Sequence, residues 1–168
     1  MWLGLNETRA ITLTASAAAV IAVWGVLSQR AIAARQATVE YIRETERDAR
    51  FLDSQRLFRN LTNDSAGLAP WALVDKAQTP EALAIKTVLN DYEMVAIGIE
   101  RGTLDDTTYR RWMRSTVVHD WRQASPYVMA VRNRLSNDAL YHEFEEMARR
   151  YRDGKGMPHR RIFWAKFF

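Results

Sequence analysis

The sequence predicts an all-α protein with three parts: a single transmembrane helix at the N-terminus, a stalk helix that continues it, and a compact antiparallel helical bundle. Three observations support this fold class. Residues 10–29 contain no charged side chain, the apolar residues after them recur at helical spacing, and no run of alternating apolar and polar residues marks a strand. The segments between the expected helices are short, which favours antiparallel neighbours in a bundle.

The charge-free segment from Ala10 to Gln29 is the predicted membrane anchor, within a first region at residues 1–29. Twenty helical residues extend about 30 Å, which matches the hydrocarbon core of a bilayer. Small residues such as Ala19 and Gly25 would let a second membrane helix approach, so a protein partner in the membrane is expected besides membrane lipid. The side chains expected to form the anchor are Ala10, Ile11, Leu13, Val20, Ile21, Val23, Trp24, Val26 and Leu27.

Two other interpretations of this segment stay open. A secretory signal peptide also carries an apolar run, and Ala31-Ile32-Ala33 supplies the small residues that a signal peptidase recognises. Against cleavage, the run is longer than in a usual signal peptide, and Arg30 lies inside the cleavage region. The segment contains six alanines. This modest apolar character also allows a buried core helix.

Arginines indicate the orientation of the anchor. Only Arg9 precedes the segment, whereas Arg30, Arg35, Arg43 and Arg47 follow it within about 20 residues, the range in which the positive-inside bias acts. The C-terminal side is therefore predicted to be cytoplasmic, with the N-terminus outside. The chain contains no cysteine, so disulfides give no information on the compartment.

Residues 30–61 are predicted to form a charged stalk, the first long helix after the anchor. No residue in this region breaks a helix, and opposite charges recur at helical spacing, as in Glu40/Arg43 and Glu44/Arg47. A sparse apolar line with near-heptad spacing runs through Ile32, Val39, Ile42 and Ala49. Such a line suits a homo-oligomer formed through the stalk, whereas its short length favours a stalk that is single or packs on its own bundle.

Residues 62–154 are predicted to form the cytoplasmic helical bundle. The segment up to residue 79 is expected to be a loop with a short helical turn around residues 71–77. A long helix then begins at the capping residue Thr79, with Pro80 at its first position, and ends at Gly102. Its expected apolar face consists of Leu89, Tyr92, Ala96 and Ile99.

Three further helices are expected after residue 104. The pair Asp105-Asp106 caps the first, which should end before Pro126. Ser125 and Pro126 begin a short second helix. Asn137 caps the third, which two glycines stop at residues 154 and 156.

Two segments of the sequence resemble a bacterial and phage family known as domain of unknown function 4760. The first is LNDYEMVAIGIERGTLD, from Leu89 to Asp105, and the second is YHEFEEMA, from Tyr141 to Ala148. Arg134 precedes the second segment as in the family, and a methionine stands there in place of the family's leucine. The resemblance covers most of residues 52–151. It implies a bacterial or phage protein with an N-terminal membrane helix, a charged stalk and further helices, and it brings no established activity.

Known catalytic and metal-binding patterns do not occur in the sequence. None of the three histidines follows a glutamate by three residues, as di-iron bundles require. His142-Glu143 is not followed by a second histidine at position 146, as a zinc protease requires. There is no nucleophile elbow and no phosphate-binding glycine loop. We therefore expect no catalytic residue, no metal and no cofactor, and predict that the protein is not an enzyme.

Glu93 is the carboxylate most suited to a role inside the bundle. It lies four residues after Leu89 and three before Ala96, close to the apolar face of its helix. A partly buried carboxylate needs a partner, which Arg132 or His119 would supply. We predict an ion pair between Glu93 and Arg132 that stabilises the bundle, in preference to a proton-handling role.

The C-terminal tail, residues 155–168, combines basic and aromatic side chains. The last twenty residues carry a net charge of +6, and four of the last six residues are aromatic. This composition suits either an anionic lipid surface or a protein partner, whereas packing of the rings on the bundle is the alternative. No nucleic-acid motif accompanies the tail, so nucleic acid is not an expected partner. The expected contact residues are Arg160, Arg161, Phe163, Trp164, Lys166, Phe167 and Phe168.

These observations predict a non-enzymatic, single-pass inner-membrane protein. Its cytoplasmic bundle would be an interaction or accessory module of a larger membrane complex. One alternative is a membrane effector or exclusion factor of a phage or its host. The other is an enzyme with an unrecognised site.

Overall fold

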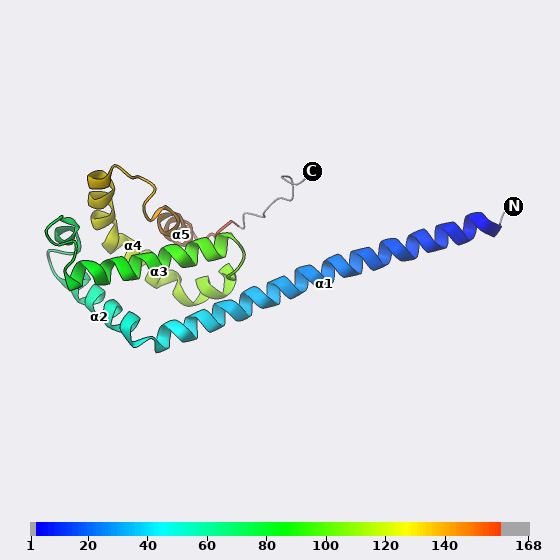
Figure 1. Ribbon diagram of the computed structural model, residues 1–168, viewed down its shortest axis with the longest axis horizontal. Coiled ribbons are helices and arrows are strands. Elements are labelled where there is room, and N and C mark those ends of the chain that lie inside the picture. Colours follow the sequence, from blue (N-terminus) through cyan, green and yellow to red (C-terminus); the bar gives the residue numbers. More distant parts are fainter. Residues whose placement is uncertain (1–2, 159–168) are drawn as a thin grey trace.

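The computed structural model describes residues 3–158 of the protein, with side chains described at residue 16 and from residue 18 to residue 158, and helices joined by turns and loops make up this part of the chain. No strand occurs in this part of the chain, and the all-α prediction is confirmed (Figure 1). The elements in order are α1 Leu3–Arg47, α2 Ala49–Asn63, the 3-10 helix η1 Ala69–Ala72, α3 Pro80–Glu100, α4 Asp106–Leu135 and α5 His142–Arg152.

The long helix α1 contains 45 residues and extends far beyond the other helices, which pack beside its C-terminal part (Figure 1). Its length is roughly 68 Å at the usual helical rise. Within the described side chains, the segment Ala18–Arg47 is long and apolar enough to cross a membrane, and its apolar window is 0% buried. The same length, composition and position also suit a signal sequence.

The stalk is not one helix over residues 30–61, because α1 ends at Arg47 and α2 starts at Ala49. Asp48 between them has an extended backbone, and its carboxylate accepts a hydrogen bond from the backbone N–H of Arg50 at 2.9 Å. This is the geometry of an N-cap, which starts a new helix. The charge pairs continue across the break, so they concealed it in the sequence. The buried residues of α2 are Phe51 and Phe58, which pack it against the bundle.

The helix α3 begins and ends where the sequence predicted. Thr79 Oγ1 accepts a hydrogen bond from the backbone N–H of Ala82 at 3.3 Å, and Pro80 is the first helical residue. Gly102 follows the helix with a φ of 73°, in the left-handed region that favours glycine. All four residues of the predicted apolar face are buried, namely Leu89, Tyr92, Ala96 and Ile99.

The helix α4 is a single helix of 30 residues, although two were predicted. Asp105 caps its start, as expected, by accepting a hydrogen bond from Thr108 N–H at 2.9 Å. Pro126 lies inside the helix and cannot donate to the carbonyl group of Arg122. The Ser125 hydroxyl donates to that carbonyl instead, at 3.2 Å. The predicted end before Pro126 was therefore wrong, because a neighbouring side chain replaces the missing bond.

The helix α5 begins at His142 rather than next to Asn137. The Asn137 side chain caps a turn, since its Oδ1 accepts a hydrogen bond from the N–H of Ala139 at 3.1 Å. Tyr141 then has a φ of 58°, and α5 starts after it. The predicted start was wrong because an asparagine cap stabilises a turn as readily as a helix.

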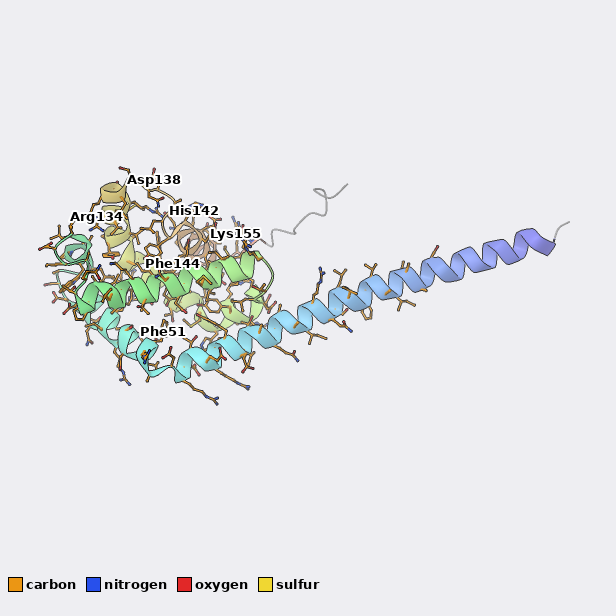
Figure 2. All side chains as sticks on the ribbon, viewed as in Figure 1. Phe51, Arg134, Asp138, His142, Phe144 and Lys155 are labelled. Atoms are coloured by element: carbon orange, nitrogen blue, oxygen red, sulfur yellow. The ribbon has the colours of Figure 1, made fainter. Side chains whose placement is uncertain are left out.

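The helices α2 to α5 and η1 enclose one apolar core. Phe144 of α5 is 0% exposed and lies within the bundle (Figure 2). Its ring stacks on Tyr92 of α3, with ring centroids 4.5 Å apart, and meets Trp121 of α4 edge-on at 5.2 Å. Tyr151, near the end of α5, donates a hydrogen bond to Asp106 at the start of α4, so these two helices are antiparallel.

Candidate functional site

Two hydrogen-bonded residues of α1, Thr38 and Tyr41, join this helix to the bundle. Thr38 is 0% exposed, and its hydroxyl oxygen accepts a hydrogen bond from the backbone N–H of Asp105 at 2.7 Å. One turn later, Tyr41 Oη donates to Asp91 of α3 at 2.5 Å. The end of the bundle that holds the α3–α4 turn therefore lies nearest to the apolar part of α1, and α3 runs antiparallel to α1.

A cleft of about 300 Å³ opens where α1 meets α2, α3 and α4. Aromatic and charged side chains from all four helices line it. They are Tyr41 and Glu46 from α1, Arg59 from α2, Asp91 and Tyr92 from α3, and Tyr109 and Trp112 from α4. The cleft thus gathers residues that are far apart in the sequence, and it is the strongest candidate for a binding site in the described structure.

Two tyrosine–carboxylate pairs lie at this cleft. One joins Tyr41 to Asp91, and in the other Tyr92 Oη donates to Asp120 Oδ2 at 2.7 Å. Burial raises the pKa of both carboxyl groups above the usual range of aspartate. Burial also raises the pKa of both tyrosine hydroxyls, so each tyrosine stays a hydrogen-bond donor at neutral pH.

Several groups in the cleft lack either an ion pair or a side-chain hydrogen bond among the described residues. Neither Glu46 nor Asp91 forms an ion pair there, and Arg59 makes no side-chain hydrogen bond. Tyr109 is 2% exposed, and its hydroxyl likewise forms no hydrogen bond with the described part of the protein. The Glu46 carboxylate and the Tyr109 hydroxyl can therefore meet a ligand or water, whereas Asp91 already accepts a hydrogen bond from Tyr41.

The cleft continues outward into an apolar groove of about 430 Å³ between α1 and α4. Val39 and Ile42 form its α1 side, and Trp112 forms its α4 side. Trp112 is 63% exposed, which is unusual for so large a ring. Arg43, Glu46 and Arg111 also line the groove, so charged side chains of both signs accompany its apolar residues.

The predicted anchor residues lie along α1, outside the bundle. The large apolar side chains from Val20 to Leu27 are between 51% and 71% exposed. Ala10, Ile11 and Leu13 belong to the same helix, but their side chains are outside the described set. No part of the described protein covers this segment.

The sequence predicted an ion pair between Glu93 and Arg132, but the structure does not contain this pair. Its carboxylate accepts hydrogen bonds from two backbone N–H groups at the start of α5, those of Phe144 at 2.7 Å and Glu143 at 3.3 Å. The first N–H groups of a helix have no partner within it and attract negative charge. The prediction was wrong because the backbone of α5 supplies the partner that a side chain was expected to supply.

Arg132 also fastens α5, through a different carboxylate. It is 6% exposed and pairs with Glu145 of α5 at 2.7 Å. Its Nε donates to the carbonyl group of Leu140 at 2.8 Å, while Nη2 is buried without a partner among the described residues. Both residues singled out in the sequence therefore hold α5 in place, each with a partner of its own.

Replacing Glu93 should weaken the attachment of α5. We expect Glu93→Ala to lower the free energy of unfolding by about 1–3 kcal/mol, since two backbone donors would lose a charged acceptor. Glu93→Gln keeps one acceptor oxygen and should cost less. Urea denaturation followed by circular dichroism measures both changes. Asp75→Ala, in an exposed loop, is the control, and equal stability of Glu93→Ala and the control would contradict this role.

Asp106 connects the start of α4 to the C-terminal part of the bundle, although the sequence predicted it only as part of a helix cap. It is 6% exposed and accepts hydrogen bonds from Tyr151 Oη at 3.0 Å and from the backbone N–H of Met157 at 3.1 Å. Arg110 lies beside it at 3.5 Å. No motif marked this role, because the two hydrogen-bond donors come 45 and 51 positions later in the sequence.

The predicted contact residues of the tail lie outside the described residues. The described chain ends at Pro158, and Met157 just before it is 6% exposed against the core. Figure 2 shows Lys155 at the end of the bundle from which α1 continues alone. The tail therefore starts at the end of the bundle nearest to the anchor. The residues outside the description are Arg160, Arg161, Phe163, Trp164, Lys166, Phe167 and Phe168.

Comparison with known proteins and structures adds one finding. Residues 12–151 match the model of a family described as a domain of unknown function, DUF4760. No curated protein and no solved structure matches the chain. Across the described residues, no three histidine, aspartate or glutamate side chains gather closely enough to hold a metal ion.

Proposed function

The chain belongs to the DUF4760 family, and from its structure we propose that it is a single-pass protein of a bacterial inner membrane with a cytoplasmic helical bundle. The bundle would serve as an interaction or accessory module of a membrane complex and would not be an enzyme. The N-terminus would lie outside, in accord with the arginines that follow the anchor.

The observation that carries this proposal is the exposure of the apolar part of α1. Its large side chains from Val20 to Leu27 pack on nothing in the described protein, yet the helix continues without a break to Thr38 and Tyr41, which dock on the bundle. A lipid bilayer would cover this surface over a length of about 30 Å. The rigid connection would then hold the bundle at a defined height above the membrane.

A second exposed apolar surface supports the role in interaction. Arg134 donates a hydrogen bond to the carbonyl group of Ala72, which brings the segment after η1 close to the end of α4. There Leu73, Val74 and Leu135 are 54%, 74% and 56% exposed. We call these three residues the distal patch, and an exposed apolar cluster formed by them would be typical of a protein-binding surface.

The absence of cysteine allows a direct test of topology. Single-cysteine variants Asn6→Cys and Asp75→Cys would be expressed in bacteria and treated with a membrane-impermeant maleimide. We expect labelling of Asn6→Cys in intact spheroplasts and of Asp75→Cys only after lysis, with the wild-type chain as the unlabelled control. Labelling of Asp75→Cys in intact spheroplasts, or recovery of the protein in the soluble fraction, would contradict the proposal.

Partner binding is tested by purification of the full chain in a mild detergent from its native membrane. We expect a partner in fixed stoichiometry that is lost from Val74→Asp, because a charge in the distal patch would oppose burial. Leu83→Asp, on an exposed position of α3, is the matched control and should retain the partner. A chain that purifies alone under every condition would argue against an accessory role.

A further inference from the structure

The cleft between α1 and the bundle has the form of a small-molecule site, which the function proposed above does not require. Four helices line it, and its volume of about 300 Å³ lies within the range of ligand pockets. Tyr41 and Glu46 belong to α1, whereas Asp91 and Tyr109 belong to the bundle. A ligand in this cleft would touch both parts of the protein.

Negative charge is in excess among the lining residues. Glu46 and Asp91 form no ion pair with any described residue, and Asp91 is partly buried. Arg59 is the cation of the lining, and its charge interacts with Asp120, the partner of Tyr92. A partly buried carboxylate without a cation costs free energy, and a bound cation would offset that cost.

Aromatic residues lie beside the two aspartates. Tyr41 and Tyr92 line the cleft with their hydroxyls turned to Asp91 and Asp120, and Tyr109 lines it with a hydroxyl that has no partner in the described structure. The faces of aromatic rings attract cations, more strongly where water is excluded. Carboxylates among aromatic rings therefore favour a positively charged ligand.

An apolar surface completes the site at its mouth. Trp112 and Met113 from α4 and Leu52 from α2 line the cleft. Trp112 is 63% exposed, so the apolar part of a ligand would gain cover against a ring that no described residue encloses. The lining thus suits a molecule with one charged end and one apolar end.

We propose that this cleft binds a small amphipathic organic cation, an aryl- or alkylammonium ion, with its ammonium group at Asp91 and its apolar part against Trp112 and Met113. An anionic ligand would face two unpaired carboxylates, and an uncharged ligand would leave them unpaired. The bound cation would join α1 to α3 and strengthen the docking of α1 on the bundle.

The test compares three probes of similar size and different charge: phenethylammonium, phenethyl alcohol and hydrocinnamate. Each is titrated calorimetrically into the full-length protein in an uncharged maltoside detergent, because charged lipids or detergents would compete for the amine. We expect saturable binding of phenethylammonium, at least about tenfold tighter than that of the alcohol or the carboxylate. Equal binding of the ammonium and the alcohol, or no saturable binding of the ammonium, would overturn the proposal.

Substitutions of residues that line the cleft test whether phenethylammonium binds there. Asp91→Asn keeps an acceptor oxygen for Tyr41 but removes the charge, and it should weaken phenethylammonium binding about tenfold. Trp112→Ala changes an exposed residue and should weaken the binding several-fold without loss of fold. Asp53→Asn removes an exposed carboxylate of α2, 71% accessible, and should have no effect.

Folding of each variant is checked by circular dichroism. Should Asp91→Asn fail to fold, Glu46→Gln at the exposed mouth replaces it, with an expected weakening of about threefold. Wild-type affinity in a folded Asp91→Asn or Glu46→Gln variant would show that the ammonium group binds elsewhere and would refute the assignment.

Discussion

Raising the pH above 10 is expected to unfold the bundle within about one to two pH units. All six tyrosines of the sequence lie in the described part of the chain, and burial raises the pKa of every one of them. For Tyr141 the pKa rises to about 12. In the unfolded chain, tyrosines ionise near pH 10.

The sign of this effect follows from proton linkage. Between about pH 10 and pH 12 the unfolded chain releases phenolic protons that the folded state retains. The folded state then binds more protons, so stability that is fully present below pH 10 is lost as the pH rises. Six tyrosines together give a slope of up to about 8 kcal/mol per pH unit. The free energy of unfolding of a domain is about 5–15 kcal/mol in total. The bundle is therefore expected to unfold within about one to two pH units.

Two signals recorded in one alkaline titration measure this transition. Near-ultraviolet absorbance reports tyrosinate, and far-ultraviolet circular dichroism reports helix content. We expect both to change together above pH 10. Tyr109→Phe is the matched variant, because the Tyr109 hydroxyl forms no hydrogen bond with the described residues; it should reduce the slope by about one sixth. Tyrosinate formation near pH 10 with an unchanged dichroism signal would contradict the burial of these rings.

The second large effect is expected for Phe144→Ala. Phe144 is 0% exposed and contacts Tyr92 and Trp121 from two other helices. Removal of a buried phenylalanine ring costs about 3–5 kcal/mol, because transfer energy is lost and a cavity remains. For a domain of this size that corresponds to a fall of roughly 10–20 °C in the melting temperature.

Differential scanning calorimetry of the full-length protein in detergent checks this value. Phe144→Leu keeps much of the apolar volume and should cost less than half as much. Met94→Ala is the surface control, because Met94 is 67% exposed on α3, and it should lie within about 0.5 kcal/mol of the wild type. A loss below about 1 kcal/mol for Phe144→Ala would show that the three-ring contact does not form.

The helix boundaries show which local signals in the sequence are sufficient to predict where a helix begins or ends. Thr79 with Pro80, Gly102 and Asp105 each act through the nearest few residues of backbone, and each marks a boundary that the structure confirms. Pro126 was misread because its effect depends on whether another group satisfies the freed carbonyl. In this chain the Ser125 hydroxyl does so.

The candidate site was beyond sequence analysis for a related reason. Tyr41 and Asp91 are 50 residues apart, and Asp106 and Tyr151 are 45 residues apart. Neither pair belongs to a motif, so no spacing rule brings its members together. The same holds for Glu93, whose partners are backbone groups that α5 exposes only because it starts at His142.

By itself, the sequence determined the helical class, the long apolar segment at the N-terminus and the caps of α3 and of the start of α4. These features depend on periodicity and on interactions within about four residues, which the order of the amino acids specifies directly. Only the tertiary structure decided the break at Asp48, the partners of Glu93 and Arg132, and the cleft beside α1. Those features depend on contacts between helices, and such contacts arise only when burial of the core brings distant residues together.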